Sequence, residues 1–135
     1  MASDTAPQTA SGDGIGTSHS ARFTVQSKDT VGHLVPGMPM VVATPYLVTI
    51  SGSVCYEIAK QLIEPSQITV GNRVEIDHLG ASKVGATLVV DASLRARDRN
   101  RFHFDITIKD GERTVAMVLH VRTAVSLQKM MAALG

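Results

Sequence analysis

The segment between Thr44 and Pro65 constrains the fold most, because it carries one long helical pattern. Apolar residues recur there at spacings of three and four, which places them in a continuous stripe along one helix face. Thr44 suits the N-cap, Pro45 suits the first helical position, where an N–H has no partner, and Pro65 ends the pattern. We therefore predict a helix over about 45–63. Its stripe consists of Leu47, Ile50, Val54, Ile58 and Leu62.

The pattern changes to period two after this helix, which predicts strands. Four consecutive strands are expected between 68 and 125, with an irregularity near Gly71 and a hairpin turn at Asp110-Gly111. A short strand is also expected at 22–26, ahead of an apolar loop. One long helix and an unbroken run of strands predict a two-layer α+β fold with an antiparallel sheet of about five strands.

The alternation assigns each strand a core face. The inner face of the first strand after the helix is predicted to carry Ile68, Val70, Val74, Ile76 and His78. Apolar residues that fall outside the core stripes suggest that the other sheet face is covered by a second subunit. These residues are Val89, Ala116, Val118 and Ala124.

A chain of 135 residues has room for one compact domain. Residues 1–20 are rich in Ser, Thr, Gly, Ala and Asp and show no hydrophobic period, so we predict a flexible tail that includes His19. Residues 21–135 are predicted to form the single domain.

Composition excludes several classes of function. The 13 basic and 12 acidic residues give a net charge of +1, and aromatic residues make up only 4%, which disfavours nucleic-acid binding. Cys55 is the single cysteine and cannot form an internal disulfide. No apolar run approaches the roughly 20 residues of a membrane span, and no basic residue precedes Arg22 as a secretion signal requires. We expect a cytoplasmic protein that does not bind membranes.

No nucleophile elbow, P-loop or H-E-x-x-H motif occurs in the sequence. Thr44 has two readings, as a helix cap or as a hydroxyl that orients a carbonyl or an oxyanion at the positive end of the helix. The patch Ser51–Ser53 places a glycine in mid-helix, where it costs about 1 kcal/mol relative to alanine. We interpret this patch as a surface that another group approaches closely.

Four motifs in the same order resemble the hotdog-fold thioesterases of the fluoroacetyl-CoA thioesterase type. They are TVGHLVPGMP at 30–39, ATPYLV at 43–48, TVGNRVEIDHLGASKVGATL at 69–88 and LHVRTAV at 119–125. The resemblance covers about 30–125, nearly the whole predicted domain. It implies a central helix wrapped by the antiparallel sheet and a homodimer with acyl-CoA sites at the subunit interface. Whether dimers pair into tetramers stays open.

The resemblance also implies catalytic residues. By position, Thr44 matches the catalytic Thr at the start of the helix and His78 matches the catalytic His. The catalytic Glu of the family falls on Gly52, a departure from the pattern, and Glu57 is rotated too far around the helix to replace it. His33, Gly52, Ser53 and Arg122 are candidate substrate-binding residues, although an ion pair would also explain Arg122.

Two functions follow. The first is hydrolysis of a small or medium acyl thioester, on CoA or another carrier, by water that His78 activates while Thr44 positions the carbonyl. The second is acyl-CoA binding without hydrolysis, because Gly52 lacks the expected acid. Neither requires a cofactor. A metal site shared by His33, His78 and His120 is a minor alternative, since nothing in their spacing brings them together.

Overall fold

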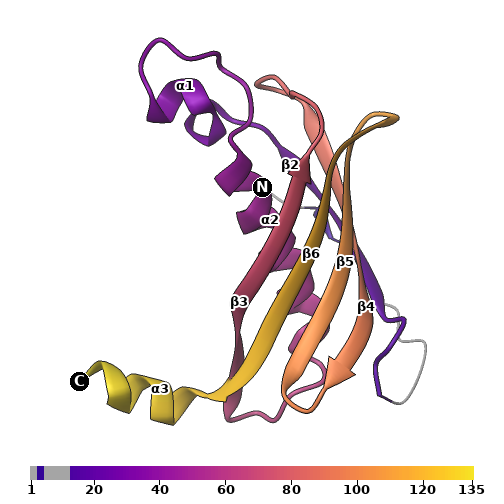
Figure 1. Cartoon of the computed structure of the whole chain (residues 1–135), viewed down its shortest axis with the longest axis vertical. Helices are drawn as coiled ribbons and strands as arrows, with labels where there is room; N and C mark the ends of the chain where they lie inside the picture. Colours follow the sequence, from indigo (N-terminus) through magenta and orange to yellow (C-terminus); the bar gives the residue numbers. More distant parts are fainter. Residues whose placement is uncertain (1–2, 5–12) are drawn as a thin grey trace.

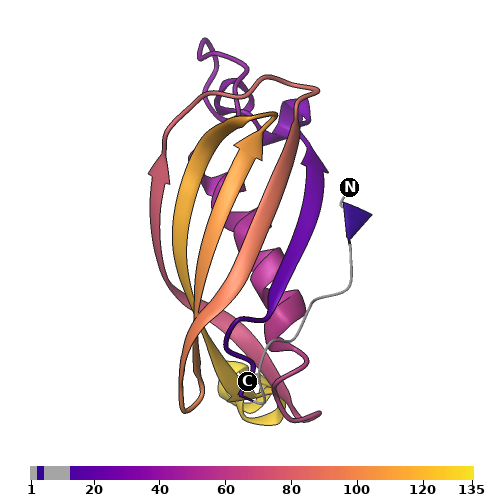
Figure 2. The ribbon, with the colours of Figure 1, turned by 90° about the vertical axis from the view of Figure 1, so that its right-hand side faces the viewer.

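The computed structural model describes residues 3–4 and 13–135. A curved antiparallel sheet wraps around one long helix, and Figures 1 and 2 show this helix lying along the concave face of the sheet. The strands are β1 (Ser3–Asp4), β2 (Ser18–Thr24), β3 (Gln67–His78), β4 (Thr87–Asp98), β5 (Arg101–Asp110) and β6 (Arg113–Ser126), in the order β1-β2-β4-β5-β6-β3. The predicted α+β class is confirmed, with five long strands and the two-residue β1.

The long helix is α2 (Thr44–Ala59), and three shorter helices lie outside the sheet. They are the 3₁₀ turn η1 (Ser27–Asp29), the single turn α1 (Val31–Leu34) and the C-terminal α3 (Leu127–Leu134). The predicted stripe of α2 faces the sheet, and its members Leu47, Ile50, Val54 and Ile58 are buried. Burying such a side chain stabilises the fold by about 1.5–3 kcal/mol.

Helix α2 departs from its prediction at both ends. Its N-cap is Ala43, and the side chain of Thr44 makes no capping hydrogen bond, so the predicted cap is wrong. Its last residue is Ala59, and beyond it the side chain of Leu62 lies against Gly14 while the Leu62 carbonyl accepts a hydrogen bond from Arg97 at 3.1 Å. The chain therefore leaves the helix before Pro65 could end it.

The N-terminal part of the sheet begins earlier than predicted. Strand β2 starts at Ser18, and β1 pairs with it through Ser3 and Asp4, so part of the predicted tail is strand. His19, assigned to that tail, is instead buried, with 4% of its surface exposed. The remainder of the predicted tail, residues 1–2 and 5–12, lies outside the described residues.

A β-bulge interrupts β3 where an irregularity was predicted. Gly71 lies opposite Arg122 and Arg73 lies opposite Val121, so Asn72 is the extra residue. The bulge shifts the alternation, and Thr69 is the buried residue of the first half of the strand. The assignment of Ile68 and Val70 to the core face with Val74 is therefore wrong, whereas the second half follows the prediction.

Strand β6 corrects the assignment of the outer sheet face. Ala116, Val118 and Ala124 are buried core residues, so they do not mark an outer apolar surface as predicted. Their neighbours Met117 and Leu119 point to the opposite face and are 54% and 41% exposed. Strand β3 is the edge of the sheet on this side. Within the described residues, no helix has the length and apolar character that crossing a membrane requires.

Candidate active site

The first candidate site joins the start of α2 to the end of β3. Thr44 Oγ1 lies 2.8 Å from His78 Nδ1, a hydrogen-bond distance. The two residues line a cavity of about 370 Å³. Its other lining residues are Val31, Val41, Val42, Leu79, Gly80 and Ala81.

Backbone hydrogen bonds fix the segment that leads into α2. The N–H of Val42 donates to the carbonyl of Ser82 at 2.9 Å, and the N–H of Ala43 donates to the carbonyl of Asp29 at 2.9 Å. The residue after them is Thr44, whose hydroxyl makes no cap and contacts the imidazole of His78 instead. The local fold thus holds a hydroxyl and an imidazole together at the positive end of a helix.

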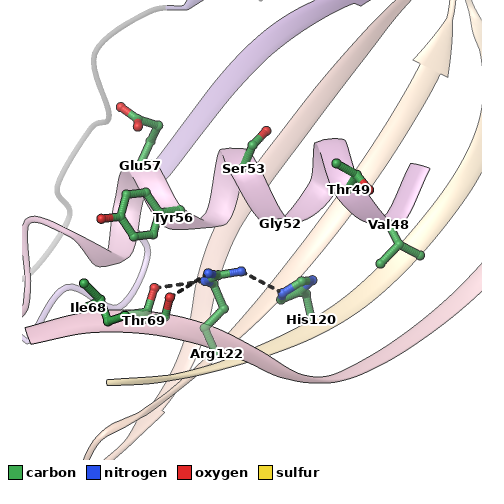
Figure 3. A pocket seen from close by; sticks show the side chains of 10 residues that line it. All are labelled: Val48, Thr49, Gly52, Ser53, Tyr56, Glu57, Ile68, Thr69, His120 and Arg122. Atoms are coloured by element: carbon green, nitrogen blue, oxygen red, sulfur yellow. Dashed lines mark hydrogen bonds between the residues drawn. The ribbon is translucent and has the colours of Figure 1, made fainter. Parts of the chain in front are cut away.

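A second cavity lies farther along α2, between this helix, β3 and β6, and measures about 570 Å³ (Figure 3). It is lined by Val48, Thr49, Gly52, Ser53, Tyr56, Glu57, Ile68, Thr69, His120 and Arg122. Thr44 and Gly52 are eight residues apart on the same helix, which corresponds to about 12 Å. The two cavities share no lining residue.

Arg122 is held under the helix by Thr69 (Figure 3). Its Nε donates to Thr69 Oγ1 at 2.9 Å, and its Nη2 donates to the Thr69 carbonyl at 2.8 Å. The guanidinium carbon lies 5.7 Å from the centre of the Tyr56 ring, a cation–π distance. These contacts leave Nη1 facing His120 and Gly52.

His120 is neutral in this arrangement. Arg122 Nη1 lies 3.3 Å from His120 Nε2, and because an arginine only donates, Nε2 must accept and the ring proton must be on Nδ1. Burial, with 3% of the residue exposed, and the positive charge of Arg122 lower the pKa of His120 to about 4. Nδ1 has no hydrogen-bond partner among the described residues.

Gly52 makes room for these two side chains. A Cβ at this position would lie 3.3 Å from both Arg122 Nη1 and His120 Cε1, which is tight but not prohibitive. A Cβ at Gly71 would lie 3.1 Å from His120 Nε2. The groups that approach the predicted small-residue patch are therefore the side chains of Arg122 and His120, which extend from β6.

The family model of fluoroacetyl-CoA-specific thioesterases matches residues 25–128. The chain belongs to this family. The fluoroacetyl-CoA thioesterase of Streptantibioticus cattleyicolor is 27% identical over 121 residues, which cover 85% of this chain and 87% of that one. A solved structure of the fluoroacetyl-CoA thioesterase FlK superposes with a TM-score of 0.83 at 26% identity, covering 89% of this chain and 93% of the other.

The hotdog fold is found in more distant proteins as well. A hot-dog-like protein from Thermanaerovibrio acidaminovorans superposes with a TM-score of 0.82 at 20% identity and covers 89% of each chain. At this level of identity the likeness concerns the fold. Both the predicted resemblance to fluoroacetyl-CoA-specific thioesterases and the predicted hotdog architecture are thus confirmed.

The candidate residues of this thioesterase family member fall into three places. Thr44 and His78 lie together, and Gly52, Ser53 and Arg122 line the second cavity. His33 is exposed on α1 and lines neither cavity, although its backbone N–H donates to Thr30 Oγ1.

Sequence reasoning missed Thr69 and Tyr56, which hold Arg122. The irregularity at Gly71 was the available signal for Thr69, because a bulge there changes which residues face inward. No set of three or more His, Cys, Asp or Glu residues that could hold a metal ion occurs in the described part of the chain. Cys55 is buried in the core, and this burial raises the pKa of its thiol.

Proposed function

We propose that this chain hydrolyses a small or medium acyl-CoA thioester, with His78 as general base and Thr44 as the group that positions the carbonyl. Its family is one of thioester hydrolases. The observation that carries the proposal is the 2.8 Å contact between Thr44 Oγ1 and His78 Nδ1 beside a cavity at the start of α2. A base within hydrogen-bond reach of a positioned hydroxyl is what acyl transfer requires.

The ring nitrogen of His78 that carries the proton determines how hydrolysis begins. If Nδ1–H donates to Thr44 Oγ1, Nε2 carries a lone pair and can remove a proton from water, which requires that a water molecule reach this buried atom when substrate is bound. The water oxygen then bonds to the thioester carbon, and the carbonyl oxygen becomes an oxyanion that accepts a hydrogen bond from the Thr44 hydroxyl. Collapse of this intermediate breaks the C–S bond, and the sulfur takes the proton from His78. The products are the free acid and the thiol of CoA.

A second route uses Thr44 as the nucleophile. It is favoured by the position of His78 Nε2, which is buried and has no hydrogen-bond partner within the described residues. In this route the Thr44 hydroxyl gives its proton to Nδ1 as Oγ1 bonds to the thioester carbon, the C–S bond breaks, and the thiolate of CoA takes the proton from Nδ1 and leaves. Water then hydrolyses the acyl ester on Thr44 to release the acid and restore the hydroxyl. An acylated Thr44 detected by mass spectrometry during turnover would distinguish this route from direct attack by water.

A homodimer would unite the two cavities. Thr44 in the first cavity and Gly52 in the second lie about 12 Å apart along α2, too far for one small acyl group to contact both residues within a chain. Pairing of two copies places the Thr44 end of one helix near the middle of the other when the helices run antiparallel. Exposed apolar side chains near the first cavity support a homodimer, because a subunit interface there would bury them. They include Leu34, Val35, Met38, Met40 and Leu79.

The second cavity is the proposed binding site for the acyl or pantetheine portion of the substrate. Arg122 offers a fixed guanidinium there, and the absence of a side chain at Gly52 lets this guanidinium lie close to the helix at the wall of the cavity. Ser53 lines the same cavity, and its hydroxyl donates to the Ile50 carbonyl at 2.8 Å, so it offers oxygen lone pairs. His33 remains a prediction for a contact outside these cavities.

Acyl-CoA binding without hydrolysis is the alternative function. It is favoured by the absence of a carboxylate among the residues that line the Thr44–His78 cavity, together with glycine at the position of the expected acid. In that case the chain binds the thioester but lacks the base strength to cleave it.

The deciding experiment measures thiol release from a panel of short, branched and aromatic acyl-CoAs. We expect turnover by the wild-type chain and its loss in Thr44→Ala and His78→Ala, with unchanged circular dichroism and melting cooperativity. Thermal stabilisation by the same acyl-CoAs without thiol release would contradict hydrolysis and support the binding function.

A further inference from the structure

Arg122 carries a charge that no acidic side chain of the described chain offsets. The ion pairs in this part of the chain involve other residues, namely Lys60–Glu57, Arg73–Glu75, Arg95–Asp105 and Arg113–Asp110. Thr69 accepts from Nε and Nη2 through neutral oxygens, and His120 is neutral. The guanidinium is therefore held in place by hydrogen bonds to neutral groups, and none of these groups neutralises its positive charge.

This charge is partly removed from solvent. Burial lowers the pKa of Arg122 from its usual value, and no carboxylate appears among the groups that oppose that effect. A guanidinium remains charged even so, since its ordinary pKa is far above neutrality. A half-buried cation of this kind gains more from an anion than a solvated surface arginine does.

The cavity beside the guanidinium has a volume of about 570 Å³, which is enough to admit a carboxylate. Gly52 and Gly71 lie close against the side chains of Arg122 and His120, since a Cβ at Gly52 would lie 3.3 Å and one at Gly71 3.1 Å from them, so the anion lies in the open part of the cavity and not directly over these glycines. Glu57, the acidic residue that lines the cavity, is already paired with Lys60 at 2.8 Å. His120 is buried, with 3% of its surface exposed, and lines the same cavity. Its Nδ1 has no hydrogen-bond partner among the described residues.

We propose that this cavity binds a carboxylate carried by the acyl group, so that the substrates are monothioesters of dicarboxylic acids. The inference rests on the proposed thioester hydrolysis and names its substrate class. The carboxylate lies in the cavity lined by Gly52 and Ser53, accepts from Nη1 of Arg122, and supplies the counter-charge that the chain itself lacks. In the homodimer proposed above, this cavity belongs to one copy, and the Thr44–His78 pair that cleaves the thioester belongs to the other.

A carboxylate fits this cavity better than a phosphate of CoA. One cation lies among the lining residues, and apolar groups of Val48, Ile68 and Tyr56 surround it. A singly charged carboxylate can accept from Nη1, the guanidinium nitrogen that Thr69 does not occupy, whereas phosphates carry more charge and are usually met by several basic groups. The two sources share anion chemistry, and the experiment below separates them.

The experiment compares acyl-CoAs matched in length, with and without a terminal carboxylate. Suitable pairs are malonyl with propionyl, succinyl with butyryl, and glutaryl with valeryl. For the wild-type chain we expect kcat/KM to be higher for at least one carboxylated member by roughly 10- to 100-fold, the usual effect of a hydrogen bond to a charged group. Equal or lower values for all three carboxylated members would overturn the inference while leaving hydrolysis intact.

Three variants assign the preference to Arg122. Arg122→Met removes the charge at similar length and should reduce the ratio between paired substrates to near one, while Arg122→Lys should retain part of it. Gly52→Glu places a carboxylate of the chain beside the guanidinium and should reverse the preference. Arg22→Met is the matched control, because Arg22 is exposed on β2, away from the cavity, and its loss changes net charge equally. A preference that persists in Arg122→Met would contradict the proposal.

Equilibrium binding keeps the test independent of turnover. Calorimetric titration with CoA, dephospho-CoA and the three carboxylated thioesters should show that Arg122→Met weakens the carboxylated thioesters selectively. Equal weakening of CoA and the thioesters, lost with dephospho-CoA, would mean that Arg122 binds a phosphate and would overturn the inference. If no thioester is turned over but the carboxylated ones bind more tightly, the hydrolysis proposal fails and the anion site stands.

Discussion

The two cavities along α2 are built on opposite principles. At the start of the helix, Thr44 and His78 contact each other at 2.8 Å, and aliphatic residues and a glycine complete the cavity. At mid-helix, Arg122 is positioned by Thr69 and His120 and faces a cavity of about 570 Å³ that Gly52 also lines. The first arrangement resembles a reactive pair. The second resembles a binding site for an anion, because no acidic side chain of the described residues pairs with the positive charge of Arg122.

This contrast indicates a division of roles, with catalysis at the first cavity and recognition of the acyl group at the second. A hydroxyl and an imidazole can act on the carbonyl of any thioester that lies between them, so the first cavity discriminates little between acyl groups. A fixed cation in a half-buried cavity discriminates strongly between neutral and anionic groups. The absence of an acidic side chain at Gly52 therefore affects the second cavity more directly than the first.

The largest expected effect concerns the reactive pair. We expect His78→Ala to lower kcat by about 10²- to 10⁴-fold, the usual contribution of general acid–base catalysis. In contrast, Arg122→Met should act mainly on KM for the same thioester. Steady-state kinetics of the two variants on one substrate checks this split. Similar losses of kcat in both would show that the cavities do not divide chemistry and binding in this way.

The second effect concerns stability in acid. The pKa of His120 is lowered from 6.5 to about 4 in the folded chain, so between these pH values the unfolded chain binds a proton that the folded chain does not. Stability should therefore fall as pH falls through this window, by about 3 kcal/mol in total, and this contribution should be constant above it. Urea unfolding from pH 4 to 7 measures the slope. His120→Gln, which retains an acceptor but does not titrate, should flatten it; an unchanged slope would contradict the neutral, buried state of His120.

A smaller effect is expected when the support of Arg122 is removed. Thr69→Val keeps the shape of a buried strand residue but deletes the acceptor of Arg122 Nε, which should cost about 1–2 kcal/mol of unfolding free energy. Thr123→Val is the control, because Thr123 Oγ1 donates to Asn72 at an exposed position. A loss in Thr69→Val no larger than in the control would mean that Thr69 does not stabilise the guanidinium.

The smallest effect is expected for Gly52→Ala. Alanine improves helix propensity by about 1 kcal/mol, but the new methyl group would lie 3.3 Å from both Arg122 Nη1 and His120 Cε1, so these side chains would have to shift slightly and would offset part of the gain. We expect a net stabilisation of about 0.5 kcal/mol in thermal unfolding. Destabilisation instead would show that His120 and Arg122 cannot yield, and that the glycine is required for packing.

The sequence predicted the parts of this molecule that depend on local periodicity. The apolar stripe of α2 and the alternation of Leu88 to Leu94 and Phe102 to Ile108 correspond directly to buried faces. Matching motifs also brought Thr44 and His78 into one hypothesis. The N-cap at Thr44 was wrong because a tertiary contact with His78 competes for the same hydroxyl, and periodicity carries no record of such a contact.

The second cavity was harder to predict. Gly52 and Arg122 were singled out, but their proximity depends on how β6 crosses under α2, which follows from the curvature of the sheet. The inner position of Thr69 depends on one extra residue in β3. A change of alternation by a single residue leaves composition and motif content intact, so the predicted facing of Ile68 and Val70 was inverted.

That extra residue makes the register of β3 a determinant of selectivity. Deleting Asn72 would restore a regular ladder and turn the Thr69 side chain to the opposite face of the sheet. Arg122 would then lose both its anchor and its orientation, although no residue that touches it had been substituted. In relatives of this chain, the length of the segment between Gly71 and Arg73 would then decide whether a fixed cation is present, independently of which side chains they carry.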